Sequence, residues 1–369
     1  MLKIESLSKA FNAKNVIENL NFEVQKNETV ALLGPNGSGK STLLNMIAGI
    51  LQPDSGNIYV DNSLVYGVRG VRKVDVKPSE RKVGYVFQKF ALFPHMRVQD
   101  NISYGLRALH LSNSEVKRRT GKLLEFVNLT EHALVYPNQL SGGQQQLVAL
   151  ARSLATEPQI ILLDEPVSAI DPQLRETFRL ELKKYLRTLE ATTLYVTHNL
   201  NEAAIMADKI AIIGNGHIEQ VGSSAEIFDK PQSRFVAKFL GTNIIEGKII
   251  KKQNDHILVE IDNNTIITVT PDMDMSEKNV VITIKPEDVI ITAEKNVKPN
   301  TINSIPGIIT EMTQMRSNTQ ITINAGFSIK AIMTSAAIKN LGVTIGDKVY
   351  VTFNPSEVNV FRENLITRN

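Results

Sequence analysis

The sequence predicts an α/β domain that is built on a parallel sheet and carries a helical subdomain, followed by an all-β domain. Two contrasting patterns along the 369 residues support this prediction. In the first two-thirds of the chain, short apolar runs alternate with longer helical stretches, as in a parallel sheet covered by helices. After about residue 241, Ile, Val and Thr alternate with polar residues, as in antiparallel strands. We therefore place the α/β domain at 1–240 and the β domain at 243–369.

The α/β domain divides further. Residues 40–50 are predicted to form a helix with Ile47 and Ile50 on its inward face. From about 95 to 157 the strand pattern disappears, and this stretch is predicted to be a separate, mostly helical subdomain. Buried strands are predicted at 29–33, 160–163, 193–197 and 210–213.

The β domain contains an internal repeat. Residues 243–247 (NIIEG) match 303–307 (NSIPG) at an offset of 60, and 283–289 match 352–358 at an offset of 69. The larger second offset indicates an insertion in the second copy. We predict two related β units in tandem, with chance similarity in an Ile-rich stretch as the alternative. The predicted units span about 243–292 and 303–362.

Composition excludes several classes of function. The chain has no cysteine, so a disulfide framework, a thiolate metal site and a cysteine nucleophile are ruled out. The net charge of +3 is too small to indicate nucleic-acid binding, and we expect no nucleic-acid partner. Residues 1–5 alternate like a strand, and no apolar run reaches the roughly 18–20 residues that cross a bilayer. We expect a soluble, cytoplasmic chain whose transport pore, if any, belongs to another polypeptide.

Residues 34–42 (GPNGSGKST) fit the pattern G-x-x-x-x-G-K-[ST] between a predicted strand and a predicted helix. Such a loop surrounds phosphates with backbone N–H groups, and the helix N-terminus adds partial positive charge. Lys40 is expected to reach the β- and γ-phosphates, and the Ser41 hydroxyl to ligate Mg²⁺. The predicted nucleotide-binding residues of the loop are Gly34, Pro35, Asn36, Gly37, Ser38, Gly39, Lys40, Ser41 and Thr42.

Two carboxylates, Asp164 and Glu165, end the buried strand predicted at 160–163. Parallel sheets place ligand-binding groups at such strand ends. Asp164 is expected to hold Mg²⁺, directly or through water, and Glu165 to take a proton from the attacking water. Two solvated acids in a turn before Pro166 are the alternative, and the phosphate loop in the same chain argues against it.

Residues 140–144 (LSGGQ) form a second candidate anion site, because a serine and two glycines directly precede a helix predicted at 145–154. One chain does not need two γ-phosphate cradles for one ATP. We therefore predict that Ser141 and Gly143 close on ATP that is held by a partner chain.

Together these motifs resemble those of the ABC ATPase family. The resemblance implies a P-loop (RecA-like) ATPase domain that works as half of a homodimer, with MgATP sandwiched between two copies. The matching segments, in the family's order, are Walker A at 34–42, Gln88 of the Q-loop, the signature Leu140, Ser141, Gly142, Gly143 and Gln144, Walker B at 160–165, the D-loop at 168–171, and Thr197-His198.

The resemblance also implies individual roles. Phe11 is similar to the aromatic residue that stacks on adenine, with core packing as the alternative for a lone aromatic. Gln88 is expected to touch Mg²⁺ and the attacking water and to sense the membrane subunit. Asp171 resembles the D-loop aspartate at the dimer seam. His198 resembles the switch histidine that contacts the γ-phosphate.

Within the family, the chain resembles an importer subunit. It lacks the coiled coils of the DNA-repair ATPases, the second cassette of the translation factors and the fused membrane domain of exporters. Residues 84–96 resemble importer ATPases whose helical subdomain grips a coupling helix of the permease. Exposed apolar groups near Phe90, Leu92 and Phe93 would suit that groove, with core packing as the alternative. The implied partners are separate permease subunits on the cytoplasmic face of the membrane and, indirectly, a substrate-binding protein.

The β tail resembles the OB-like (TOBE, molybdate-binding-type) domain of molybdate/tungstate importer ATPases, which implies tandem OB-like units. That family's oxyanion-binding runs correspond to 300–303 and 354–356, where Asn303 and Ser356 persist but the arginine and lysine are replaced. Neutral donors lose charge-assisted hydrogen bonds to an oxyanion. We expect molybdate, tungstate or a related anion as cargo. Ferric-iron, sulfate, sugar or polyamine importers are the alternatives, because their ATPases carry related tails.

Two hypotheses from other classes compete with an importer subunit. One is a soluble ABC ATPase that remodels nucleic acid or ribosomes, which stimulation of ATP hydrolysis by nucleic acid would favour. The other is a ligand-sensing regulator, which tight oxyanion binding by residues 243–369 would favour.

Overall fold

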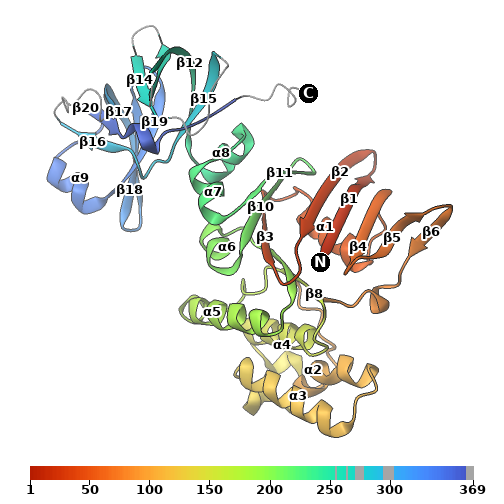
Figure 1. Cartoon of the computed structure of the whole chain (residues 1–369). Helices are drawn as coiled ribbons and strands as arrows, with labels where there is room; N and C mark the ends of the chain where they lie inside the picture. The colour runs from red at the N-terminus through yellow and green to blue at the C-terminus, as the bar shows by residue number, and fades with distance from the viewer. Residues whose placement is uncertain (254–255, 263–264, 271–277, 294–302, 363–369) are drawn as a thin grey trace. The chain divides into compact units, whose positions relative to one another are not determined.

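The computed structural model describes residues 1–253, 256–262, 265–270, 278–293 and 303–362 (Figure 1). The chain forms two compact units, Met1–Ser224 and Ala225–Asn369. The sequence placed the boundary near 240 instead. The two helices between these positions are α7 (Ser224–Asp229) and α8 (Arg234–Leu240), and α8 packs against the first strand of the second unit.

The first unit is built around a six-stranded sheet in the order β11-β10-β3-β9-β8-β7. Five of its strands are parallel, and β11 runs antiparallel at the edge. The central strands are buried on both faces, which explains their unbroken apolar runs. The strands predicted from those runs are therefore confirmed. The bounds are β3 (Thr29–Leu33), β7 (Val83–Val86), β8 (Ile160–Asp164), β9 (Thr192–Val196), β10 (Lys209–Gly214) and β11 (His217–Gly222).

Parallel pairing gathers four strand ends at one edge of this sheet. Val196 at the end of β9 is paired with Leu32 of β3 on one side and with Asp164 of β8 on the other. Val86 at the end of β7 is paired with Leu163. The segments that follow these strands therefore leave the sheet side by side, which is where parallel sheets bind ligands.

A second sheet in the first unit is antiparallel, in the order β2-β1-β4-β5-β6. Its apolar face shares a core with α1 (Lys40–Ala48) and the parallel sheet. The helix is shorter than predicted, and Ile50 is 53% exposed instead of inward-facing. The Ile50 N–H donates to Asn45 O (2.9 Å), which turns the chain out of the helix. The strands are β1 (Leu2–Phe11), β2 (Lys14–Val24), β4 (Ser55–Val60), β5 (Ser63–Arg69) and β6 (Arg72–Asp75).

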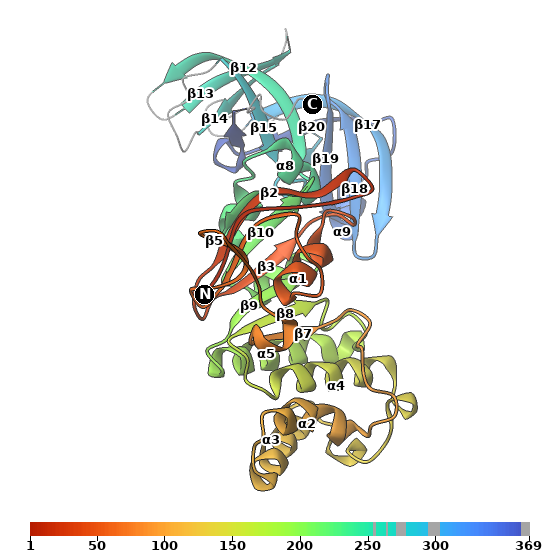
Figure 2. The ribbon, with the colours of Figure 1, turned by 90° about the vertical axis from the view of Figure 1, so that its right-hand side faces the viewer.

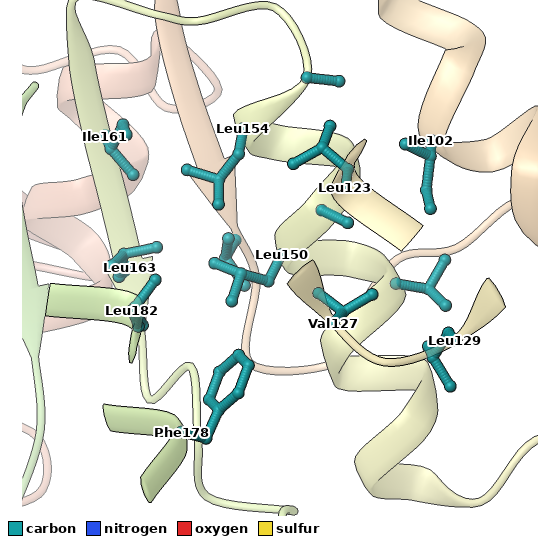
Figure 3. Close-up of a cluster of buried hydrophobic side chains, with 14 of the residues drawn as sticks. Ile102, Leu123, Val127, Leu129, Leu150, Leu154, Ile161, Leu163, Phe178 and Leu182 are labelled. Atoms are coloured by element: carbon teal, nitrogen blue, oxygen red, sulfur yellow. The ribbon is translucent and has the colours of Figure 1, made fainter. Parts of the chain in front are cut away.

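The helical subdomain predicted at about 95–157 contains three α-helices, and it shares a core with β8. Figure 3 shows Leu150, near the middle of the third helix, lying between Leu163 of β8 and Val127 at the end of the second. This packing joins the subdomain to the sheet that bears the strand ends described above. The helices are α2 (Val98–Ala108), α3 (Asn113–Phe126) and α4 (Gly142–Leu154), followed after β8 by α5 (Pro172–Thr188) and after β9 by α6 (Leu200–Met206).

The second unit contains two five-stranded antiparallel sheets, β14-β13-β12-β15-β21 and β19-β18-β17-β20-β16 (Figure 2). Each strand of the first copy, β12 to β16, corresponds to the strand numbered five higher, β17 to β21. The last strands of the two copies are exchanged: β21 of the second copy pairs with β15, and β16 of the first copy pairs with β20. The two copies are thus intertwined around one core. The strands are β12 (Asn243–Gln253), β13 (His256–Asp262), β14 (Thr265–Val269), β15 (Asn279–Ile284), β16 (Ile290–Thr292), β17 (Asn303–Met315), β18 (Asn318–Asn324), β19 (Ser328–Thr334), β20 (Lys348–Phe353) and β21 (Asn359–Phe361).

The copies differ in length between their third and fourth strands. The offset between corresponding strands is 63 from the start of β14 (265) to that of β19 (328), and 69 from the start of β15 (279) to that of β20 (348). Helix α9 (Ser335–Leu341) lies in this longer connection of the second copy.

Two buried asparagines form hydrogen bonds between the two copies. Asn243, at the start of β12, accepts from Lys330 N (2.7 Å) and donates to Lys330 O (2.9 Å). Asn303, at the start of β17, makes the same pair of bonds with Thr268 (2.8 Å each). Each asparagine therefore links the first strand of its own copy to the third strand of the other.

Replacing Asn303 by Ala is expected to lower the free energy of unfolding by about 1–3 kcal/mol, because the Thr268 N–H and C=O would lose their partner in a half-buried place. Thermal or urea unfolding of the full chain measures this loss. The matched control is Asn340→Ala on the exposed side of α9, which is expected to leave unfolding unchanged. Equal stability of the two variants would contradict the role of Asn303.

In the part of the chain that the structure describes, no helix has the length and apolarity that crossing a membrane requires.

Candidate nucleotide site

A cavity of about 350 Å³ opens at the edge of the parallel sheet where the four strand ends meet. Residues from the phosphate loop, the Q-loop, the Walker B strand and β1 line it together, although they are far apart in the sequence. The predicted site residues among them are Phe11, Asn36, Gly37, Gly39, Lys40, Ser41, Thr42, Gln88, Asp164 and Glu165.

The phosphate loop connects β3 to α1 and positions Lys40 at the cavity. The Lys40 ammonium donates to Gly34 O and Pro35 O (2.8 Å each), so it lies across the mouth of the loop. Burial lowers the pKa of Lys40, and the nearby carboxylates Glu165 and Asp164 oppose this shift. At Gly39 the backbone φ is 102°, and a Cβ atom would come within 2.6 Å of Ile17, so this position requires glycine.

Ser41 and Asp164 form an oxygen pair beside Lys40. The Ser41 hydroxyl donates to Asp164 Oδ2 at 3.0 Å. Burial raises the pKa of Asp164, while the hydrogen bond from Ser41 lowers it. This donor set fits Mg²⁺, which prefers oxygen ligands and takes only one or two carboxylates beside water and phosphates. The described residues contain no cluster of three or more His, Cys, Asp or Glu suited to a metal.

The Glu165 carboxylate lies between the side chains that follow β7 and β9. Its Oε1 is 2.9 Å from His198 Nδ1, and its Oε2 accepts from Gln88 Nε2 at 3.4 Å. The backbone of Glu165 has φ 51°, a left-handed conformation that is uncommon for a residue with a side chain. Strained conformations of this kind concentrate at functional sites. The turn aims the carboxylate along the row of strand ends.

Phe11 also borders the cavity. Its side chain is 44% exposed, which excludes core packing, and Lys9 Nζ lies 5.5 Å from the ring centroid. An exposed aromatic face beside a phosphate loop is suited to stacking on a base. Its contact with adenine stays a prediction.

The signature and D-loop residues do not line this cavity. Ser141 and Asp171 are exposed helix caps: Ser141 Oγ accepts from Gln144 N (3.3 Å), and Asp171 Oδ1 accepts from Gln173 N (2.8 Å). Gln144 Oε1 accepts from Ser141 N (2.9 Å), which completes a capping box and starts α4 three residues earlier than predicted. Gly142 and Gly143 form the first turn of this helix.

The apolar groups expected to be exposed in the Q-loop region are half-buried instead. Leu92 packs against the core of the helical subdomain. The ring of Phe93 lies 4.8 Å from that of Tyr104, and Arg152 lies 5.0 Å from its centroid. Phe90 is also half-buried, and its carbonyl accepts from Arg152 (3.2 Å). Partial core packing, the alternative for these side chains, therefore holds for Leu92, and Phe93 lies against Tyr104 of α2 and Arg152 of α4.

Arg81 was not predicted from the sequence. It supports the C-terminal end of α1, the helix that follows the phosphate loop. Its side chain is 2% exposed, and its guanidinium donates to Met46 O and Ile47 O (2.9 Å each) at the end of α1. It also pairs with Asp75 (3.2 Å). A single arginine outside any motif gives no signal of such a role. Gln146, which contacts the backbone of Glu165, was missed for the same reason.

Of the two residues that persist from the family's oxyanion-binding runs, Asn303 is bonded within the fold and Ser356 is exposed. Residues 300–302 lie outside the described part of the chain. Both polar atoms of the Asn303 amide are bonded to Thr268, so this side chain serves the link between the copies. Ser356 is exposed in a short turn, η4 (Pro355–Glu357). The sequence left oxyanion binding by the tail open, and the paired amide of Asn303 does not favour it.

The chain matches two family models. The model of the ABC transporter family matches residues 17–168, and the model of the TOBE domain matches 299–360. A solved structure described as a dimeric post-hydrolysis state of the ATP-binding cassette MJ0796 bound to ADP and Pi is 32% identical. It covers 61% of this chain and 99% of its own length, with a TM-score of 0.55.

Curated relatives extend over nearly the whole chain. The spermidine/putrescine import ATP-binding protein PotA of Thermobifida fusca is 36% identical over 96% of this chain and 91% of the relative. The molybdate/tungstate import ATP-binding protein WtpC of Pyrococcus abyssi is 36% identical over 98% and 100%. The sulfate/thiosulfate import ATP-binding protein CysA 1 of Shewanella oneidensis is 35% identical over 95% and 91%. The chain thus belongs to the ABC import ATP-binding proteins, ATP-hydrolysing subunits in which an ABC ATPase domain precedes a TOBE domain.

Proposed function

We propose that the chain binds MgATP in the cavity at the strand ends, hydrolyses it as one protomer of a homodimer, and thereby drives a separate permease. The observation that carries this proposal is the position of Glu165. Its carboxylate is 2.9 Å from His198, and it lines one cavity with Lys40, Ser41 and Asp164. A potential base, a γ-phosphate ligand and a metal-binding pair are thus within reach of one nucleotide.

In this proposal each side chain has one task. Lys40 exchanges its two carbonyl partners for the β- and γ-phosphates. Ser41 and Asp164, with Gln88, hold Mg²⁺, which neutralises charge on the phosphates when bound. Glu165 accepts a proton from the attacking water, and His198 orients the γ-phosphate.

The homodimer supplies the groups that the cavity lacks. Ser141 and Gly143 lie outside the cavity of their own chain, and Ser141 and Asp171 are exposed. In the dimer, the start of α4 from one copy would close on the γ-phosphate held by the other, because a helix N-terminus binds anions. The dimeric MJ0796 cassette supports this arrangement.

For the cargo, two classes have support. The resemblance of the β tail points to molybdate, tungstate or a related anion, and relatives named for molybdate/tungstate and sulfate/thiosulfate agree with it. Polyamines are the second candidate, because several relatives are named for spermidine/putrescine import, including those of Thermobifida fusca and Thermotoga maritima. An oxyanion site in the tail itself is not favoured, because the arginine and lysine are replaced and the amide of Asn303 is hydrogen-bonded to Thr268. These features of the tail do not bear on what the permease carries.

The test is reconstitution. The chain is co-purified with its permease and placed in vesicles. The vesicles contain ATP, and the ATPase subunit faces their interior, which corresponds to the cytoplasm. Hydrolysis is then measured with the binding protein and spermidine, molybdate or sulfate outside. We expect stimulation by one cargo class. Stimulation by nucleic acid instead, without any permease, would favour a soluble remodelling ATPase and overturn the importer assignment.

A further inference from the structure

Gln146 is a fully buried polar residue that no predicted motif includes. It lies on α4, two residues after the signature segment, and its side chain is 0% exposed. A buried side-chain amide must find partners for both its donor and its acceptor, or destabilise the fold. The partners of Gln146 therefore show what this position holds together.

Both ends of the amide bond to backbone beside the catalytic carboxylate. Gln146 Nε2 donates to the carbonyl of Glu165 at 2.7 Å, and Gln146 Oε1 accepts from the N–H of Ala169 at 2.8 Å. Ala169 belongs to the D-loop, 168–171. One side chain thus joins three segments: the signature helix, the residue after the Walker B strand, and the D-loop.

The bond to Glu165 acts on a strained residue. Glu165 has a left-handed backbone at φ 51°, and its carbonyl also accepts from Ser168 Oγ (3.0 Å) and Ser168 N (3.2 Å). A strained conformation persists only when its surroundings hold it. Among these donors, Gln146 makes the shortest bond, and it is the donor that comes from another element of the fold.

The contact between α4 and the D-loop is also close at Gly143, three residues earlier on α4 and within the signature. A Cβ atom on Gly143 would approach Ala169 O to 2.9 Å. From the other side, Arg175 of α5 donates to Ser168 O (3.1 Å) and Ile170 O (2.8 Å). The D-loop backbone is therefore held between α4 and α5, and Gln146 bonds its central N–H.

We propose that Gln146 is a positioning residue. It fixes the backbone of Glu165, and so the place of the carboxylate beside His198, relative to the signature helix and the D-loop. Because α4 and the D-loop carry the residues that meet the partner copy, the same link makes the position of Glu165 depend on closure of the dimer. This inference rests on the proposed role of Glu165 as the base.

The test compares three variants of the full chain in steady-state ATP hydrolysis. Gln146→Met keeps the side-chain volume and removes both hydrogen bonds. We expect kcat to fall about tenfold to a hundredfold, the usual effect of a misplaced catalytic group, with little change in KM or in the Kd for MgATP. The control is Leu154→Ala, two turns later on α4, which loosens the same helix through lost packing without contacting Glu165 or Ala169.

Gln146→Glu provides a readout that a merely structural role would not change. An ionised carboxylate still accepts from Ala169 N–H but cannot donate to Glu165 O, whereas a protonated carboxyl can do both. Burial raises the pKa of such a carboxyl, so the rate relative to the wild type is expected to rise as pH falls from about 8 to about 6. The rate of Gln146→Met relative to the wild type is expected to stay constant over the same pH range.

The outcomes separate the two proposals. If Gln146→Met keeps kcat within about twofold, or if Leu154→Ala with a similar loss of Tm lowers kcat as much, the positioning role is overturned. A flat pH ratio for Gln146→Glu would overturn it as well. If Glu165→Gln also keeps its turnover, then the role of Glu165 fails, and with it the proposed mechanism.

Discussion

Glu165→Gln is expected to bind MgATP about as tightly as the wild type and to lower kcat by about 10²–10⁴-fold, the usual contribution of a general base. The amide has the shape of the carboxylate and can still reach His198 and Gln88, so the cavity should keep its form. It cannot accept a proton from water. Release of phosphate gives kcat, and binding of a fluorescent ATP analogue gives the Kd.

A second measurement follows from the same change. With hydrolysis blocked, ATP should stay trapped between two copies, so the variant with MgATP is expected to elute as a dimer and without nucleotide as a monomer. Glu176→Gln, on the exposed face of α5, is the matched control and should hydrolyse ATP at the wild-type rate. Ample turnover by Glu165→Gln would refute its role as the base. A strictly monomeric ATP-bound variant would refute the sandwich.

Mixing Lys40→Ala with Ser141→Ala is expected to restore activity that neither variant has alone. In the proposed dimer, each site combines Lys40 of one copy with Ser141 of the other. A mixed dimer therefore contains one site with both residues intact and one site with neither. With random exchange and independent sites, the mixture should reach about a quarter of the wild-type rate.

The matched control is a mixture of Lys40→Ala with Ser41→Ala. Both of these residues line the cavity of their own chain, so every site of this mixed dimer lacks one of them. No recovery is expected. Recovery in both mixtures, or in neither, would show that the signature does not act on the nucleotide of the partner copy.

Sequence alone predicted the segments that line the cavity, because the chemistry proposed for them is local. A phosphate loop needs its glycines, lysine and hydroxyl within nine consecutive residues, 34–42, and the Walker B carboxylates follow directly on a strand. The parallel sheet was equally predictable, since strands buried on both faces must be continuous apolar runs. The change from alternating helices and strands to β structure after about residue 241 also follows from the local pattern of side chains.

Features that depend on contacts between distant residues could not be predicted. Which surfaces meet after folding decides that Ile50 is exposed, that Phe93 packs against Tyr104, and that Arg81 bonds to the end of α1. The exchange of closing strands between the two β copies has no sequence signal, because each strand has the same pattern in either sheet.

Asn303 shows the difference most clearly. From the sequence it was a candidate oxyanion ligand, and its residue type was consistent with that role. The tertiary structure pairs both of its polar atoms with Thr268, 35 residues away. Gln146 is the converse case, since an unremarkable glutamine becomes a link between three segments. Which chemistry is available was determined by the sequence. Which polar groups bond to one another was decided by the fold, because a buried amide binds whatever backbone the packing brings within reach.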